Sequence, residues 1–556
     1  MTGAIAIIYP FPTIDSNPTM VESLAGFAQK GYGVDVYTCS SEGYLSPKLN
    51  FPGIRLIDLY QGYEPGNDLN KDICSNNGKK AYDFIIGCDP EGLLLACPHA
   101  LFLNVPLIYL SFELVFWDEL HLPEDFRQKR MEVEASRFVD IVVIQDRDRA
   151  ALLSAENNIP MEKFCFLPVA PKGPGVQGRS EYLRKKFQIE DHRTILLHSG
   201  DFSHRTMGHE LVSASWRLPE NCCLVIHTRS FTGNISYFEK AKRLSHPDRV
   251  IFSSAPLDYA RYQDLVSSCD IGIVIQNPGG DSKYTQKNLF HIGRASGKLS
   301  FYAKYGKPII ANQLPSFNTL VSESNAGRIL KDMSQLPGLV REIMDSYPQL
   351  SRNSLALFSD VLDFSLYFPD LADRLSLLKN PKRASWSQPS RLSETMADLF
   401  AEGILQTAVN HVKQGALCKS NEMAAYYASL RPGNSSAQIP LHFYTGVARK
   451  SNGEPEKALR HFQLARVSES EFYPHIKCWE GAVLRDLERY DEAVDAFREA
   501  MEADPENSEI RLKEIMTLMK AGRFQEAARS VNQGLESHPE TEGLNELKAK
   551  LERMNG

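Results

Sequence analysis

The chain has 556 residues, which is too long for a single hydrophobic core and predicts about three or four folded units at roughly 150 residues each. Hydrophobic residues make up 43% of the sequence and charged residues 24%, proportions that are ordinary for a soluble globular protein. The formal net charge of -7 excludes a global electrostatic attraction to nucleic acid or to an anionic membrane, so nucleic acid is not expected as a partner.

The first apolar run, residues 4–9, is too short for a signal peptide and has no basic segment before it. The ten cysteines include no C-x-x-C pair, and apart from the adjacent Cys222 and Cys223 they are scattered through apolar segments. This pattern is typical of reduced core thiols and not of a disulfide framework or a zinc site. We therefore expect a cytoplasmic protein.

In residues 1–172, short apolar runs rich in β-branched side chains alternate with amphipathic helical stretches. The strands of this first series are expected at residues 4–9, 34–38, 54–58, 82–87, 106–110 and 141–144. The alternation predicts a parallel sheet covered by helices on both faces. Residues 92–117 are apolar enough to suggest a membrane span, but Pro98, Asn104 and Glu113 interrupt them, so a buried helix followed by a buried strand is the better interpretation.

Residues 167–175 are rich in proline and glycine, which is typical of an interdomain linker, and a second α/β domain is expected at residues 173–380. Its strands are predicted at residues 194–198, 223–227, 249–252, 271–275 and 308–311. Two tandem doubly wound sheets place a cleft between the carboxyl ends of their strands. A dinucleotide oxidoreductase is disfavoured, because residues 10–18, which follow the first strand, contain no glycine.

After a predicted linker at residues 381–395, the pattern in residues 396–556 is helical and contains an internal repeat. The residues that recur at a spacing of 35 are Gly446, Ala458, Phe462 and Ala465, matched by Gly481, Ala493, Phe497 and Ala500. Small residues where two helices touch, with an aromatic residue in the second helix, are what a stacked helical hairpin requires. The segment resembles tetratricopeptide repeats, with at least three units and a weaker one before Pro432. Such repeats are expected to bind a protein partner.

The segment SGKLSFYAKYGKPIIAN, residues 296–312, begins with Ser296, Gly297 and Lys298 and ends in a short apolar strand. One interpretation is an ordinary helix with a serine N-cap. The other is an anion site, because a hydroxyl, an unhindered backbone N–H and a cation meet at the positive end of a helix.

The order strand, loop, Ser-x-Lys, helix, Gly-Lys-Pro, strand in this segment resembles the donor half of GT-B glycosyltransferases, particularly family 4 and its relatives. The resemblance to this family also includes three other segments, residues 27–40, 198–219 and 267–278. In total it covers roughly residues 1–380. It implies two Rossmann-like domains, with the acceptor on the first and a nucleotide sugar on the second. The implied reaction transfers the sugar to a saccharide, a lipid-linked saccharide or a protein.

A departing nucleoside diphosphate develops negative charge, so fixed cations and backbone N–H groups lower the barrier, and neither a metal ion nor a cofactor is expected. Under the resemblance, Lys298 and Arg205 are the cations, and Ser296, Gly297 and Gly200 allow the close approach of the backbone. The alternative for both cations is a solvated surface side chain.

On the acceptor side, residues 105–114 match a family strand that ends in a polar residue facing the cleft. Glu113 is the only carboxylate there, and an apolar setting is expected to raise its pKa and suit it to proton transfer or to orientation of the acceptor. The alternative is a structural acid that caps the following turn. His99 is expected to be a helix-end residue and not a catalytic one.

The sequence departs from the family at the E-x7-E carboxylate pair, where Gly293 and Phe301 stand instead. Asp281 or Glu323 are the acids that could replace them, and residues 15–17 stand where relatives place paired glycines. The sequence therefore leaves three hypotheses: an active transferase, a non-catalytic scaffold with the same two-domain shell, or an epimerase or phosphorylase. Peripheral contact with a membrane also stays open, although no basic amphipathic helix stands out.

Overall fold

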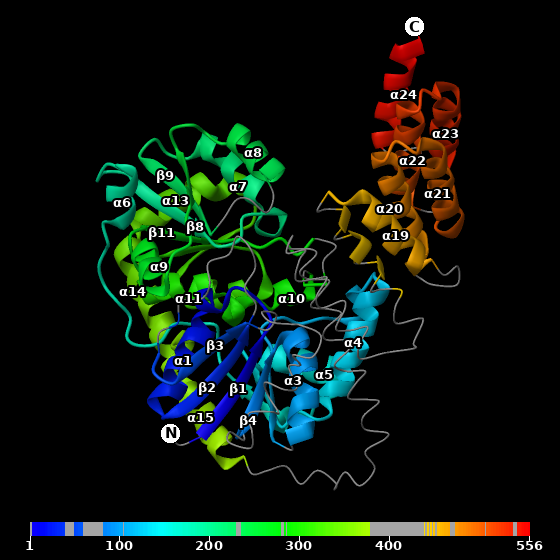
Figure 1. Cartoon of the computed structure of the whole chain (residues 1–556). Helices are drawn as coiled ribbons and strands as arrows, with labels where there is room; N and C mark the ends of the chain where they lie inside the picture. Colours follow the sequence, from blue (N-terminus) through cyan, green and yellow to red (C-terminus); the bar gives the residue numbers. More distant parts are fainter. Residues whose placement is uncertain are drawn as a thin grey trace. The chain divides into compact units, whose positions relative to one another are not determined.

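The computed structural model describes residues 3–38, 49, 51–58, 82–103, 105–229, 235–279, 283–284, 286–378, 439, 442–443, 445–447, 449–450, 453–466, 473–505, 507–537 and 542–555. The chain divides into two compact units. The first contains two parallel β-sheets with their helices, and the second is helical in its described residues (Figure 1). The predicted linker at residues 381–395 and the weak repeat before Pro432 lie outside the described residues.

The first sheet has seven parallel strands in the order β3-β2-β1-β4-β5-β6-β7. They are β1 (Gly3–Tyr9), β2 (Tyr32–Thr38), β3 (Ile54–Asp58), β4 (Phe84–Cys88), β5 (Leu107–Leu110), β6 (Ile141–Ile144) and β7 (Phe164–Phe166). The first six occur where the apolar runs predicted them. The interior strands β5 and β6 are continuous apolar runs because they are buried on both faces. The edge strand β7 was not predicted, since three residues are too few to show a pattern.

Helices cover this sheet on both faces: α1 (Pro18–Gln29), α3 (Asp89–Leu103), α4 (Pro123–Ser136) and α5 (Arg147–Asn157). The apolar residues 92–117 are divided between α3 and β5, as expected, and both are buried in the domain core. Within the described part of the chain, no helix is long and apolar enough to cross a membrane.

The second sheet has six parallel strands in the order β10-β9-β8-β11-β12-β13. They are β8 (Thr194–Ser199), β9 (Cys222–Thr228), β10 (Val250–Ser254), β11 (Ile271–Val274), β12 (Ile309–Asn312) and β13 (Gly327–Leu330). Its covering helices are α6 (Tyr182–Phe187), α7 (Gly208–Ala214), α8 (Ile235–Leu244), α9 (Tyr259–Ser267), α11 (Gly297–Lys304), α13 (Leu336–Asp345) and α14 (Tyr347–Leu357). The strand β13 was not predicted, while the other five occur at the expected residues.

The strand order reverses between β1 and β4 in the first sheet and between β8 and β11 in the second. Ligands of open α/β sheets bind outside the carboxyl ends of the strands at such reversals. After the second sheet the chain returns to the first, because α15 (Phe368–Leu377) contributes Phe368, Leu371 and Leu375 to the first sheet's core (Figure 1). The two sheets are therefore tied together by the chain at both ends of the second domain.

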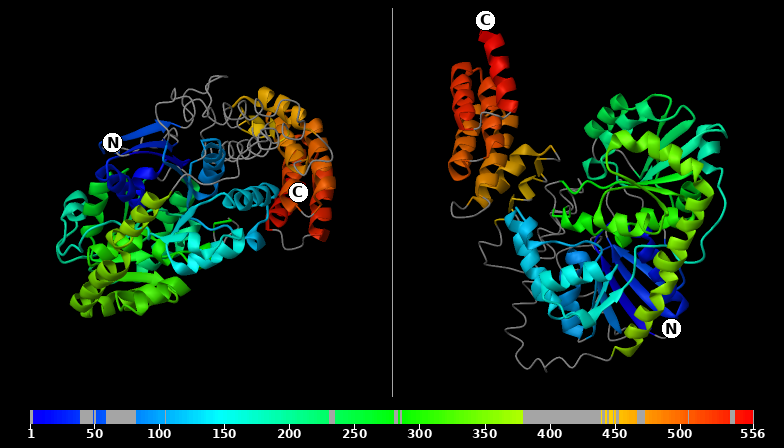
Figure 2. Two further views of the ribbon diagram at one scale, coloured as in Figure 1. Left: turned by 90° about the horizontal axis from the view of Figure 1, so that it is seen from below. Right: turned by 180° about the vertical axis from the view of Figure 1, so that it is seen from behind.

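The second unit is a stack of helices, and Figure 2 shows them side by side in orange to red. They are α19 (Pro455–Ala465), α20 (Tyr473–Asp486), α21 (Tyr490–Ala503), α22 (Ser508–Lys520), α23 (Phe524–Ser537) and α24 (Glu542–Asn555). A Cβ atom added to Gly481 would lie 3.0 Å from the ring of Phe497, and one added to Gly446 would lie 2.7 Å from Phe462. The recurring glycines are thus the points where paired helices touch, which confirms the interpretation of the 35-residue spacing.

Candidate functional site

Lys298 is the second residue of α11 and has the most unusual environment among the predicted site residues. Its stem is partly exposed, but its Nζ atom is buried and has no hydrogen-bond partner among the described residues. Burial lowers the pKa of Lys298 to about 8; Asp201 opposes this shift and Arg205 adds to it. A buried amine without a hydrogen-bond partner is costly, so this position suits an anionic ligand.

Gly200 follows β8 and faces the amine of Lys298. Its φ angle of +99° is in the region that favours glycine. A Cβ atom there would lie 4.0 Å from both Cε and Nζ of Lys298. The structure therefore brings Gly200 and Lys298, both named from the sequence as phosphate-binding candidates, together at the carboxyl end of β8, and the backbone conformation there favours glycine.

Arg205 lies in the short 3-10 helix His204–Thr206, which is capped by Ser203. Its side chain is exposed, and Nη2 donates a long hydrogen bond of 3.4 Å to the carbonyl oxygen of Tyr284. The backbone oxygen of Arg205 accepts from the N–H of Asn277 at 2.7 Å. The loop after β8 is thus attached to the loop after β11, and the Arg205 guanidinium, which is always charged and can bind phosphate with two N–H groups, lies exposed on it.

His198 is a further residue of this cluster that sequence reasoning missed. It is buried at the end of β8, its Nδ1 atom has no partner among the described residues, and Nε2 lies 2.9 Å from the carbonyl oxygen of Asp201. Burial lowers the pKa of His198 to about 3, and the nearby charge of Lys298 lowers it further. His198 is therefore neutral at physiological pH and does not compete with Lys298 for an anion. A polar residue at the carboxyl end of a buried strand was the signal that could have found it.

Ser296 and Gly297 each have a structural role at the start of α11. Ser296 is the N-cap of α11, and its buried hydroxyl accepts from the N–H of Leu299 at 3.4 Å, so the capped-helix interpretation is confirmed. A Cβ atom on Gly297 would lie 3.2 Å from Val169 Cγ1 and 3.4 Å from Pro18 Cγ. Gly297 therefore allows α11 to pack against the first domain, and a phosphate contact at either residue stays a prediction.

Glu113 follows β5 and is partly exposed. Its Oε2 atom accepts a hydrogen bond of 2.5 Å from Nδ2 of Asn288. The prediction of an apolar setting for Glu113 is wrong, because the amide of Asn288 and the guanidinium charge of Arg149, from other parts of the chain, lie near its carboxylate. The side chains lie close only in the folded protein, so the local sequence around Glu113 gave no sign of them.

Asp89, not Glu113, is the carboxyl that holds the turn after β5. One oxygen, Oδ1, accepts from the N–H groups of Phe112 and Glu113 at 2.7 and 2.9 Å. Burial raises the pKa of Asp89 well above its usual range, and the charges of Glu113 and Glu91 raise it further. Sequence reasoning missed Asp89, although an acid directly after β4 was available as a signal.

Two further contacts extend the network around Arg205 and Glu113. The carbonyl oxygen of Tyr284 accepts from Arg205 and also, at 3.1 Å, from Nδ2 of Asn288. Arg229, which follows β9, pairs with both carboxylate oxygens of Asp15 at 3.0 and 2.8 Å. The loop after β1 is thus bound to the second domain by an ion pair.

The positions of the E-x7-E pair carry no carboxylate in this chain, and both residues are packed against neighbours. Phe301 is buried in the core of the second sheet against Tyr262, and a Cβ atom on Gly293 would lie 2.9 Å from side-chain atoms of Leu320 and Ser316. Of the two replacements considered, Glu323 is exposed, and Asp281 lies outside the described residues. Across the described ranges, no group of three or more His, Cys, Asp or Glu side chains is placed to hold a metal ion.

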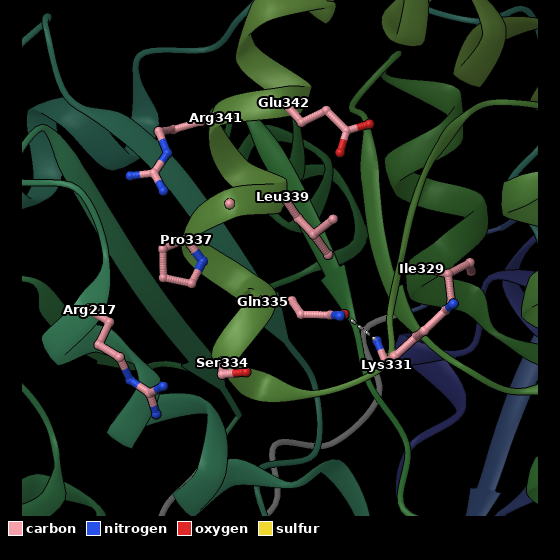
Figure 3. Close-up of a pocket in the computed structure, with 10 residues that line it drawn as sticks. Arg217, Ile329, Lys331, Ser334, Gln335, Pro337, Leu339, Arg341 and Glu342 are labelled. Carbon is pink, nitrogen blue, oxygen red and sulfur yellow. Dashed lines mark hydrogen bonds between the residues drawn. The ribbon is translucent and has the colours of Figure 1, made fainter.

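A hollow of about 800 Å³ lies elsewhere on the second domain, along α13 (Figure 3). Its rim carries the exposed cations Arg217, Lys331 and Arg341, while Leu339 and Pro337 form part of its wall. None of the predicted site residues lines this hollow, so it is separate from the candidate site around Lys298 and Glu113.

The helical repeats match two tetratricopeptide repeat family models, over residues 445–508 and 484–551. The structure is similar to that of HepE from Anabaena in complex with UDP and glucose, at 13% identity and a TM-score of 0.51, over 68% of this chain and 100% of HepE. The structure of HepE in complex with UDP-glucose is similar at 14% identity and a TM-score of 0.50, over 67% of this chain and 100% of HepE. Sucrose-phosphate synthase from Thermosynechococcus elongatus is similar at 17% identity and a TM-score of 0.51, over 67% of this chain and 99% of that protein. No curated protein matches the chain.

At these identities the likeness shows the fold. The fold class predicted from the sequence is confirmed: two tandem Rossmann-like domains of the GT-B type, followed by helical tetratricopeptide repeats.

Proposed function

We propose that the chain is a glycosyltransferase that moves a sugar from a nucleoside-diphosphate donor to an acceptor hydroxyl. The observation that carries this proposal is the buried amine of Lys298 beside Gly200, which has no hydrogen-bond partner in the part of the chain that the structure describes. It lies where the strand order reverses in the second sheet. Support also comes from the fold, which is similar to that of a protein solved with UDP-glucose.

In this proposal the charge on the departing diphosphate is stabilised by the ammonium of Lys298 and the guanidinium of Arg205. Both cations act without a metal ion or a cofactor, because they supply the fixed positive charge that the leaving group needs. Glu113, on the first domain, orients the acceptor hydroxyl and receives its proton. The buried amine is the stronger contributor, since a charge in a low-dielectric site interacts more strongly than an exposed one.

The test is a calorimetric titration of the full chain with UDP, GDP and ADP. One nucleotide is expected to bind saturably at pH 7, and its affinity is expected to fall by about tenfold or more at pH 9.5. The reason is that Lys298, with a pKa of about 8, loses its charge over this interval, whereas Arg205 stays charged and His198 stays neutral. Binding that does not change with pH would remove Lys298 from the site, and no binding to any nucleotide would contradict the proposal.

The second candidate is a non-catalytic scaffold, and the packing at positions 293 and 301 favours it. Gly293 and Phe301 are fixed by their neighbours, so the donor sugar would lack the carboxylates that relatives place there. A scaffold that kept the nucleotide site would bind UDP and still release no sugar from UDP-glucose or another nucleotide sugar. Sugar release that depends on Lys298 would exclude it.

The repeats are proposed to bind a protein partner or a protein acceptor. A chain that ends at residue 392 is expected to keep its nucleotide affinity within about twofold, because the repeats form a separate compact unit. The same truncation is expected to lose the proteins that co-purify with the full chain. Calorimetry and pull-down measure the two effects, and aggregation of the shortened chain would mean that the repeats are integral to the fold.

A further inference from the structure

Asn288 connects the two sides of the candidate site. It lies in α10 (Lys287–Phe290), which belongs to the second domain, and it is only 1% exposed. Its Nδ2 atom donates to Oε2 of Glu113 and to the carbonyl oxygen of Tyr284, at 2.5 and 3.1 Å. Its Oδ1 atom accepts from the N–H of Leu114 at 3.0 Å and from Nη2 of Arg149 at 3.2 Å.

These four contacts fix the orientation of the amide. Both groups that face Oδ1 are donors, and both groups that face Nδ2 are acceptors, so a flipped amide would place donor against donor and acceptor against acceptor. The side chain therefore presents one N–H to Glu113 in a single direction. A buried amide with all its contacts satisfied is also a rigid one.

Arg149 holds Asn288 in turn. Its guanidinium is fully buried and donates to the carbonyl oxygen of Phe112 at 2.7 Å, in the first domain. It also donates to the carbonyl oxygens of Asn288 and His291, at 3.4 and 3.3 Å, in the second. One side chain thus binds the backbone beside Glu113 and the backbone that carries Asn288.

We propose that Asn288 is the positioning residue of Glu113, and this inference rests on the proposed function. The amide holds Oε2 of the carboxylate, while no described residue donates to Oε1, which is left to meet the acceptor hydroxyl. Because Tyr284 accepts from Asn288 and also from Arg205, the same short segment adjoins the cation that faces the donor diphosphate. The second domain thereby sets the direction of the acceptor-side carboxylate.

Asn288→Asp is the informative substitution. It keeps an oxygen for Leu114 and Arg149, and the new carboxylate pairs with the buried guanidinium, so the local fold is preserved. It removes the N–H that Glu113 accepts and places a like charge beside it. A control of the same chemistry is Asn353→Asp, which removes an amide donor to the carbonyl oxygen of Asn325 in a different part of the second domain.

The first readout is the rate at which a carbodiimide and an amine label Glu113 in the full chain, followed by mass spectrometry of its peptide. Labelling is expected to be at least threefold faster in Asn288→Asp than in the wild type, and unchanged within twofold in Asn353→Asp. Equal rates in all three proteins would overturn the inference. This readout needs no substrate, so it decides the contact even if the wild type binds no nucleotide and the proposed function fails.

The second readout is the hydrolysis of UDP-glucose, or of the sugar nucleotide whose base the titrations select. Asn288→Asp is expected to lower kcat at least tenfold with the nucleotide Kd unchanged, and to cause no further loss in a Glu113→Gln background. Additive losses would show that Asn288 acts independently of Glu113, which would overturn the inference while leaving the transferase proposal intact.

Discussion

Replacing Lys298 with methionine is expected to stabilise the ligand-free protein and to weaken nucleotide binding by at least tenfold. The pKa of Lys298 is about 8 in the folded chain against 10.5 for an ordinary lysine. Between these two pH values the unfolded chain binds more protons, so folding stability rises with pH, and below pH 8 the full cost of the buried charge is present. At pH 7 this cost is on the order of 1–3 kcal/mol, and methionine removes it while filling the same space.

The measurement is thermal unfolding at pH 7 with and without the nucleotide selected by titration. Lys304→Met is the matched control, since Lys304 lies on the same helix and has a pKa that burial also lowers. Its Nζ atom, however, donates to the carbonyl oxygen of Lys172 at 2.6 Å, so its loss should lower the melting temperature and leave nucleotide binding unchanged. If Lys298→Met were as destabilising as Lys304→Met, the amine would have a structural partner and the anion site would be withdrawn.

Glu113→Gln is expected to lower the transfer rate by about 10²–10⁴, the range for loss of a positioned general base, with nucleotide affinity unchanged. Glutamine keeps an oxygen that can accept the hydrogen bond from Asn288, so the interface between the two domains should survive. Only the capacity to receive a proton is removed. Initial rates of nucleotide release, measured with a set of saccharide and protein acceptors, would give the size of the effect.

Glu162→Gln is the control for this experiment, because Glu162 is an exposed acid of the first domain that lies outside the site. It should leave the rate unchanged. A Glu113→Gln variant with full activity would show that Glu113 has only the structural role considered from the sequence. A variant that lost nucleotide affinity together with activity would place Glu113 on the donor side instead.

Interior strands such as β5 and β6 were predictable because each is a continuous apolar run whose pattern is visible within a few residues. The repeats were predictable for a similar reason, since Gly481 and Phe497 recur at a fixed spacing from Gly446 and Phe462. The edge strands β7 and β13 were missed, because such short strands are defined mainly by their pairing with a neighbour. The edge strands β3 and β10 are longer and showed an apolar pattern of their own.

The sequence by itself determined the tandem sheets and the helical repeats, because the periodicity of strands, helices and repeats is visible in local residue patterns. Only the tertiary structure decided the environment of each side chain. Burial of the Lys298 amine, and the bond between Glu113 and an amide 175 residues away, arise where distant segments pack together. Desolvation and hydrogen-bond partners decide what a charged group can do, and neither is encoded in the residues next to it.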